Sequence, residues 1–153
     1  MALLQNNVAK GSVKMPTPDD MSLIAFRMSY TLTADITLND IIEMGNLPAG
    51  CVPVDLILDN DDMDTGATGT VSFGVLNAAK ADIDLTAASG GGVWLTATSI
   101  QAATAARADL VGLRNMSRVI SSQADRPIGF KVAAETIAAA GQVIAATLLY
   151  RPA

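Results

Sequence analysis

Phe26-Arg-Met-Ser-Tyr-Thr-Leu-Thr-Ala34 alternates apolar and polar or charged side chains at every position. Successive side chains of an extended strand point to opposite faces, so a period of two places Phe26, Met28 and Tyr30 on one face. Arg27 and Ser29 then fall on the other face. This pattern predicts a β-strand that is half buried against a core.

Further short segments with the same character follow, separated by turn residues. We expect strands over residues 36–44, 52–58, 70–76, 93–97, 116–121, 128–134 and 142–150. Pro53 lacks an amide donor, which predicts an edge position or a late start for its strand. The segment 142–150 is apolar on both faces, as in a strand covered on both sides. Residues 99–108, with Ser99 as N-cap, predict one short helix.

About eight strands joined by turns predict an all-β protein, a single jelly-roll-like β-sandwich over residues 21–153. Residues 1–20 precede it and show no sustained period, with Pro16 and Pro18 near their end. We expect this stretch to be an extended N-terminal arm that a partner orders.

The composition indicates that part of the surface is apolar and is removed from water by a membrane or a partner protein. Of 153 residues, 50% are hydrophobic and 16% charged, with a mean hydropathy of +0.37, whereas about 25% charged residues is usual. A membrane is one possible cover, but residues 132–150 carry Glu135 and Gln142 and do not suit a spanning helix. No signal-peptide pattern opens the chain, so we expect a soluble protein made in the cytoplasm. A protein interface is the other cover.

The residue types exclude most catalytic chemistry. The chain has no histidine and one cysteine, Cys51, so a single chain can hold no Ser–His–Asp or Cys–His site and no internal disulfide. Carboxylate-only hydrolysis is left, and Asp82 and Asp84 form a pair. A sugar cleft would need more aromatic residues than this chain offers. We expect no enzyme, no catalytic residue and no cofactor.

The charges are segregated along the chain. Residues 35–84 hold ten acids and one base, a net −9, while residues 85–153 hold six bases and three acids, a net +3. The candidate interaction residues are the basic side chains Lys10, Lys14, Arg114 and Arg118. An acidic and a basic patch could meet between neighbouring copies, or folding could bring them together within one subunit. Nucleic-acid binding would call for more stacking aromatics and a pI above 4.4.

The loop Asp59-Asn-Asp-Asp-Met-Asp-Thr-Gly66 is the one dense cluster of oxygen ligands. Its metal candidates are Asp59, Asp61, Asp62 and Asp64. Calcium needs several such ligands close together, but no register of the loop matches an EF-hand. A solvated hairpin turn is the preferred interpretation, and a calcium site is the alternative.

Three segments in order resemble a known family. They are Tyr30-Thr-Leu-Thr, Leu38-Asn-Asp-Ile-Ile-Glu-Met and the long run from Leu47-Pro-Ala-Gly through Asp61-Asp-Met-Asp-Thr-Gly66. This order is similar to that of the capsid decoration, or cement, proteins of tailed bacteriophages. Thr147-Leu-Leu-Tyr-Arg151 resembles their closing strand.

The resemblance implies a virion protein on the capsid exterior, a homotrimer that clamps neighbouring major capsid protein subunits and catalyses nothing. A neck or tail component of the virion is an alternative. A carbohydrate- or calcium-binding β-sandwich module is another, although the low aromatic content speaks against it.

Overall fold

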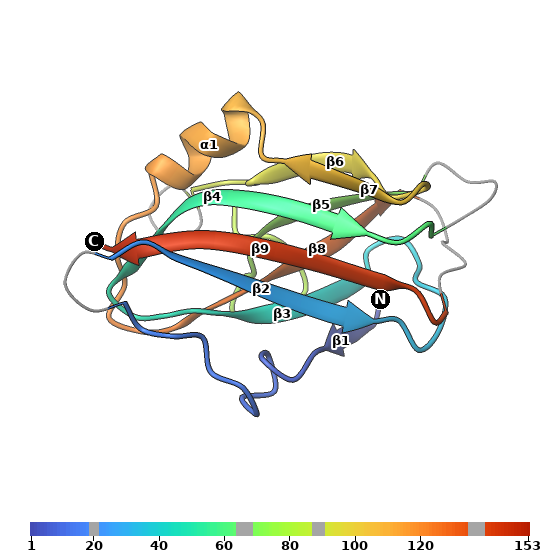
Figure 1. Cartoon of the computed structure of the whole chain (residues 1–153), viewed down its shortest axis with the longest axis horizontal. Helices are drawn as coiled ribbons and strands as arrows, with labels where there is room; N and C mark the ends of the chain where they lie inside the picture. The colour runs from blue at the N-terminus through green and yellow to red at the C-terminus, as the bar shows by residue number, and fades with distance from the viewer. Residues whose placement is uncertain (19–21, 64–68, 87–90, 135–139) are drawn as a thin grey trace.

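The computed structural model describes residues 1–18, 22–63, 69–86, 91–134 and 140–153. In this part of the chain, nine strands form two stacked sheets, with one short helix beside them (Figure 1). In chain order the elements are β1 (Leu3–Gln5), β2 (Ile24–Thr31), β3 (Ile41–Leu47), β4 (Cys51–Asn60), β5 (Thr70–Val75), β6 (Leu95–Ser99), β7 (Thr104–Arg107), α1 (Leu110–Ser117), β8 (Arg126–Ala134) and β9 (Val143–Pro152).

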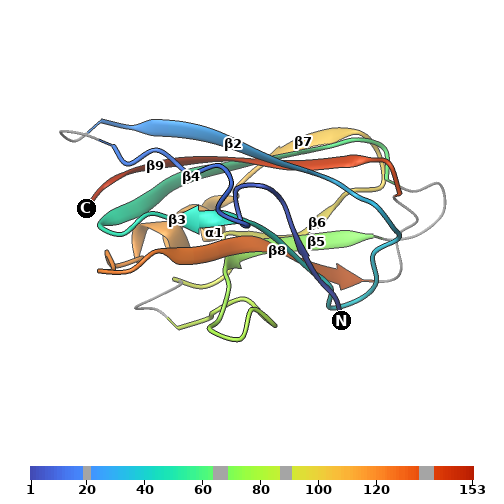
Figure 2. The ribbon, with the colours of Figure 1, turned by 90° about the horizontal axis from the view of Figure 1, so that it is seen from below.

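The two sheets have the strand order of a jelly roll. One runs β1-β3-β8-β5-β6 and the other β2-β9-β4-β7, and Figure 2 shows them as two layers. Antiparallel pairing joins β2 to β9, β3 to β8, β4 to β7 and β5 to β6. The first of these strands thus pairs with the last, and each later pair nests inside the one before, which is a long hairpin rolled into two sheets. The predicted jelly-roll-like sandwich is confirmed.

The core lies between the layers and is filled from alternate strand positions. Phe73 on β5 and Phe130 on β8 are fully buried, with ring centroids 4.7 Å apart in an edge-to-face arrangement. Trp94, also fully buried, has its ring centroid 6.0 Å from that of Phe73. Such pairs add about 0.5–1.5 kcal/mol beyond their buried area. The period of two therefore predicted the inward face correctly.

The helix is not where the sequence predicted it. Residues 99–108 form the end of β6 and all of β7, because pairing with β4 overrides the helix propensity of their alanines. The helix covers Leu110–Ser117 instead, and Met116, expected to begin a strand, lies within it. Met116 and Val119 are both buried, at the i, i+3 spacing of a helical turn rather than the i, i+2 spacing of a strand.

Pro53 does not mark an edge strand, because β4 lies between β9 and β7. However, β7 pairs only with Ile57–Asn60, so the half of β4 that carries Pro53 has a strand on one side alone. The missing amide donor is tolerated there. The prediction that β9 is covered on both faces is met only in part. β9 is an inner strand of its sheet, between β2 and β4, and Ile144 and Leu148 on its inward face are buried, but Leu149 on the other face is only half buried.

Residues 1–18 lie against the sandwich, whereas the sequence predicted an extended arm that a partner orders. β1 pairs in parallel with β3, and Met15, only 8% exposed, belongs to the main core. The Tyr150 hydroxyl donates a hydrogen bond of 2.6 Å to the Pro16 carbonyl oxygen. These contacts are made by backbone groups and by apolar side chains that do not recur at a regular spacing. The sequence pattern therefore did not reveal them. Residues 19–21 are outside the described part, and the boundary between an arm of residues 1–20 and a domain of residues 21–153 stays a proposal.

Candidate interaction surface

Helix α1 is held rigidly at three points. The side chain of Asp109 caps its N-terminus by accepting a 2.7 Å hydrogen bond from the Gly112 amide. A β-carbon at Gly112 would collide with the Trp94 carbonyl oxygen. Only glycine therefore allows the helix to approach the backbone at Trp94 this closely. Asn115 donates from Nδ2 to the Val93 carbonyl oxygen at 2.7 Å.

Two large apolar residues at the start of α1 and a third just beyond its end are exposed to solvent. Leu110 is 85% exposed, Val111 54% and Ile120 62%. Beside them, a groove of about 480 Å³ runs between the helix and the start of β4, with Leu113 and Val54 in its walls. We call Val54, Leu110, Val111, Leu113 and Ile120 the α1 face. Single exposed apolar residues are ordinary, but several of them on and beside one helix that borders a groove are typical of an interaction site.

Basic side chains surround the α1 face. Arg114 and Arg118, both predicted as interaction residues, are exposed on the helix itself. Arg151, at the end of β9, lines the groove. Within the described residues none of the three forms an ion pair, so their charges are available to a partner. Sequence reasoning had not selected Arg151 or the apolar residues, because only the fold brings β9, β4 and α1 together.

The other predicted interaction residues, Lys10 and Lys14, lie elsewhere. Both belong to the N-terminal segment, which runs along the β1 and β2 edge of the sandwich, whereas α1 lies at the β4 and β7 edge (Figure 1). Lys10 borders a polar hollow formed with Asn6 and Tyr30. Lys14 borders a second hollow. The four basic residues therefore form two separate surfaces.

Buried carboxylates tie down the N-terminal segment. Asp40 accepts hydrogen bonds from the amides of Ala2 and Thr37. Burial by itself would raise the pKa of Asp40, but the hydrogen bonds from Thr37 and Ala2 outweigh it and bring the pKa below its usual value. Glu43, fully buried, accepts from Gln5 and forms a 2.7 Å ion pair with Lys80.

The acidic loop begins at the far end of β4. Asp59 there forms an ion pair with Arg27, whose Nε donates to Asp59 Oδ2 at 3.1 Å. Asp61 Oδ2 accepts a 2.8 Å hydrogen bond from the Val143 amide. Asp62 is exposed and Asp64 lies outside the described residues. In the portion described, no three acidic, cysteine or histidine side chains are grouped as a metal site requires.

The remaining candidates for chemistry have structural partners. Asp82 forms a 2.8 Å ion pair with Lys131, whose hydrogen bond lowers the pKa of Asp82. Asp84 accepts from the Thr86 amide at 2.9 Å. A general acid would need a raised pKa, which is the opposite of the shift at Asp82. Cys51 is buried, and burial raises the pKa of its thiol, which disfavours the reactive thiolate. The described helix is too short and too polar to cross a bilayer.

The comparisons with known proteins agree with this fold. No protein-family model and no curated sequence matches the chain. A chain of the solved capsid of Ralstonia phage GP4 is similar to it, with 32% identical residues, a TM-score of 0.77 and 99% of both chains covered. The chain belongs to a family of bacteriophage capsid proteins. The capsid asymmetric unit of cyanophage Pam1 holds a chain with a TM-score of 0.58 and 18% identity, covering 94% of this chain and 96% of that one, which shows the same fold.

In this capsid protein, the α1 face and the N-terminal segment are the two candidate surfaces for contacts with neighbouring proteins. A capsid component acts by contacts with its neighbours rather than by catalysis. Exposed apolar and unpaired basic groups at two separate edges of one small sandwich are suited to that work.

Proposed function

We propose that this capsid protein decorates the outside of the shell and stabilises it by binding across neighbouring major capsid protein subunits. The observation that supports this most is the separation of its two interaction surfaces. The N-terminal segment, with Lys10 and Lys14, lies at one edge of the sandwich, and the α1 face lies at the other. A chain with contacts on both sides can join two neighbours, each of which is either a shell subunit or another copy of this chain.

We propose further that the protein acts as a homo-oligomer, a trimer. The low charged fraction and the exposed α1 face favour a second protein surface over solvent. Oligomerisation also multiplies the contacts with the shell. Several weak contacts then act together through their high effective concentration.

A protein that binds the assembled shell and not the free subunits stabilises the assembled state by mass action. Heads that lack this protein should therefore assemble but release DNA at a lower temperature or under osmotic shock. The test is to compare heat-induced DNA release from bare heads, decorated heads and bare heads to which purified protein has been added back. Added protein should restore the resistance of decorated heads. Identical release curves for all three would refute a stabilising role.

A further inference from the structure

We propose that the α1 face binds the acidic end of a second copy of this chain, so that the copies associate head to tail. The acidic end is defined by Asp61 and Asp62, just beyond β4. This inference rests on the proposed homo-oligomer and names the surfaces that would form it.

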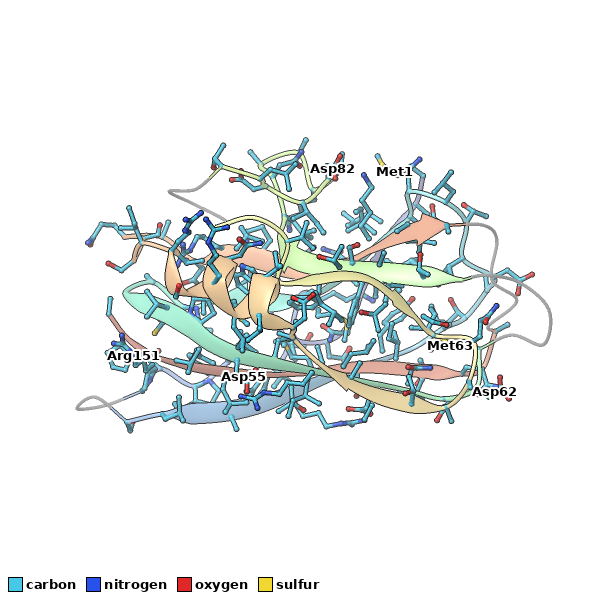
Figure 3. The ribbon with its side chains drawn as sticks, turned by 90° about the horizontal axis from the view of Figure 1, so that it is seen from above. Met1, Asp55, Asp62, Met63, Asp82 and Arg151 are labelled. Carbon is cyan, nitrogen blue, oxygen red and sulfur yellow. The ribbon has the colours of Figure 1, made fainter. Side chains whose placement is uncertain are left out.

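The first argument is that the two charged surfaces cannot neutralise each other within one chain. β4 begins at the α1 groove, with Val54 in its wall, and ends directly before Asp61. An extended strand rises about 3.3 Å per residue, which puts roughly 25 Å between the two surfaces. Figure 3 shows Arg151 and Asp62 at opposite ends of the sandwich. That distance exceeds the screening length of about 8–10 Å at physiological salt.

The second argument is that both surfaces have charges to offer. Arg114, Arg118 and Arg151 form no ion pair within the described residues, and neither do Asp61 and Asp62. Asp109, the acidic residue directly before the helix, already caps the N-terminus of α1. Folding pairs part of the two charged segments within one chain, since Asp55 forms an ion pair with Arg107 and Asp82 with Lys131. It leaves Asp61 and Asp62 without an ion pair to Arg114, Arg118 or Arg151 within the described residues.

The third argument concerns rigidity and shape. Asp109, Gly112 and Asn115 fix α1, so Leu110 is displayed at 85% exposure on an ordered helix. A groove bordered by arginines suits an acidic surface such as that of Asp61 and Asp62, and the apolar residues beside the groove supply area that loses water on contact. A preorganised surface loses little conformational entropy on binding.

The fourth argument is symmetry. A contact between different surfaces of identical chains is heterologous, and it closes into a ring when the rotation between copies divides a full turn. The surfaces lie at opposite ends of the long axis (Figure 3). Three copies joined head to tail close into a ring if each is rotated by a third of a turn from the one before, as the proposed trimer requires.

Charge reversal tests the contact directly. One variant combines Arg114→Glu with Arg118→Glu, a second combines Asp61→Lys with Asp62→Lys, and a third carries all four substitutions. Light scattering at tens of micromolar should give wild-type protein a mass near three times 15.8 kDa. Each double variant should fall toward a single chain, because like charges then meet, and the fourfold variant should recover the oligomer. Double variants that keep the wild-type mass, or a fourfold variant that fails to recover it, would overturn the pairing.

The apolar part of the contact has its own matched control. Leu110→Ser with Val111→Ser should dissociate the oligomer, whereas Leu85→Ser, at a leucine 70% exposed outside α1, should not. All of these side chains are exposed, and unchanged thermal unfolding of the dissociated chains would verify that the fold is intact. Equal loss of oligomer in the Leu85 variant would argue against a specific role for the α1 face.

Two outcomes separate this inference from the proposed function. Wild-type protein that is monomeric in solution would refute the oligomer and this contact, while attachment to the shell would still stand. Variants of the α1 face that stay oligomeric but no longer bind bare heads would show that the face docks on the shell. That result would refute the contact and support decoration.

Discussion

Gly112 of α1 lies directly against the carbonyl oxygen of Trp94, with no room for a β-carbon between them. Trp94 is fully buried in the sandwich core. This one close approach joins the helix that carries the exposed apolar surface to the rigid part of the molecule.

Gly112→Ala should therefore push α1 away from the sandwich. We expect a loss of about 1–3 kcal/mol in the free energy of unfolding, the usual cost of overpacking. Urea denaturation measures it, with Val111→Ala on the exposed side of the same helix as control. Since alanine is the better helix former, an equal or higher stability of Gly112→Ala would contradict the close approach.

Deleting residues 1–18 should destabilise the fold. The deletion removes Met15 from the core and leaves the Tyr150 hydroxyl without its Pro16 partner. Burial of a methionine side chain contributes about 1.5–3 kcal/mol. Thermal unfolding of the truncated protein should show a clearly lower midpoint. An unchanged midpoint would show that residues 1–18 add nothing to the stability of the sandwich, as expected of an extended arm that only a partner orders.

Attachment by the N-terminal segment is better tested without deletion. Lys10→Glu with Lys14→Glu should leave the unfolding midpoint nearly unchanged, because neither lysine forms an ion pair within the described chain. Binding to bare heads should weaken, and binding of wild-type protein should fall as salt rises. Lys10→Arg with Lys14→Arg keeps the charge and should bind normally. Undiminished binding of the glutamate variant would show that these lysines do not anchor the protein.

Asp40 should make stability depend on pH in the acid range. The pKa of Asp40 is lowered in the folded protein. Its contribution to the free energy of unfolding is therefore complete above the pKa of the unfolded chain, about 3.9, and is lost as the pH falls through the pKa of the folded protein. Asp40→Asn should cost about 1–3 kcal/mol at pH 7, since hydrogen bonds from Ala2 and Thr37 weaken. The difference from wild type should shrink near pH 3. Urea denaturation at both pH values measures it, and a constant difference would contradict the prediction.

Calcium should not stabilise the protein. Asp59 is occupied by Arg27 and Asp61 by the Val143 amide, so two of the four loop carboxylates already have partners. The melting temperature should be the same with millimolar calcium and with chelator. A clear rise with calcium that disappears in Asp61→Asn with Asp62→Asn would support the calcium interpretation of the loop.

The fold class and the inward face of the strands could be predicted from the amino-acid sequence alone. Alternation such as Phe26 to Ala34 is a local property of an extended chain, and so is visible without knowing what the strand pairs with. The absence of histidine and the uneven distribution of charge were equally plain in the sequence.

Which segments meet depends on the three-dimensional path of the chain. The alanines of residues 102–108 favour a helix locally, yet β7 exists because β4 offers it backbone partners. The docking of residues 1–18 depends on Tyr150 and Asp40, which are distant in the chain. The fold places Arg151 and Val54 beside the helix, and the length of β4 separates this surface from Asp61 and Asp62. Contacts between distant residues leave no period in a sequence, since each depends on the path of the whole chain.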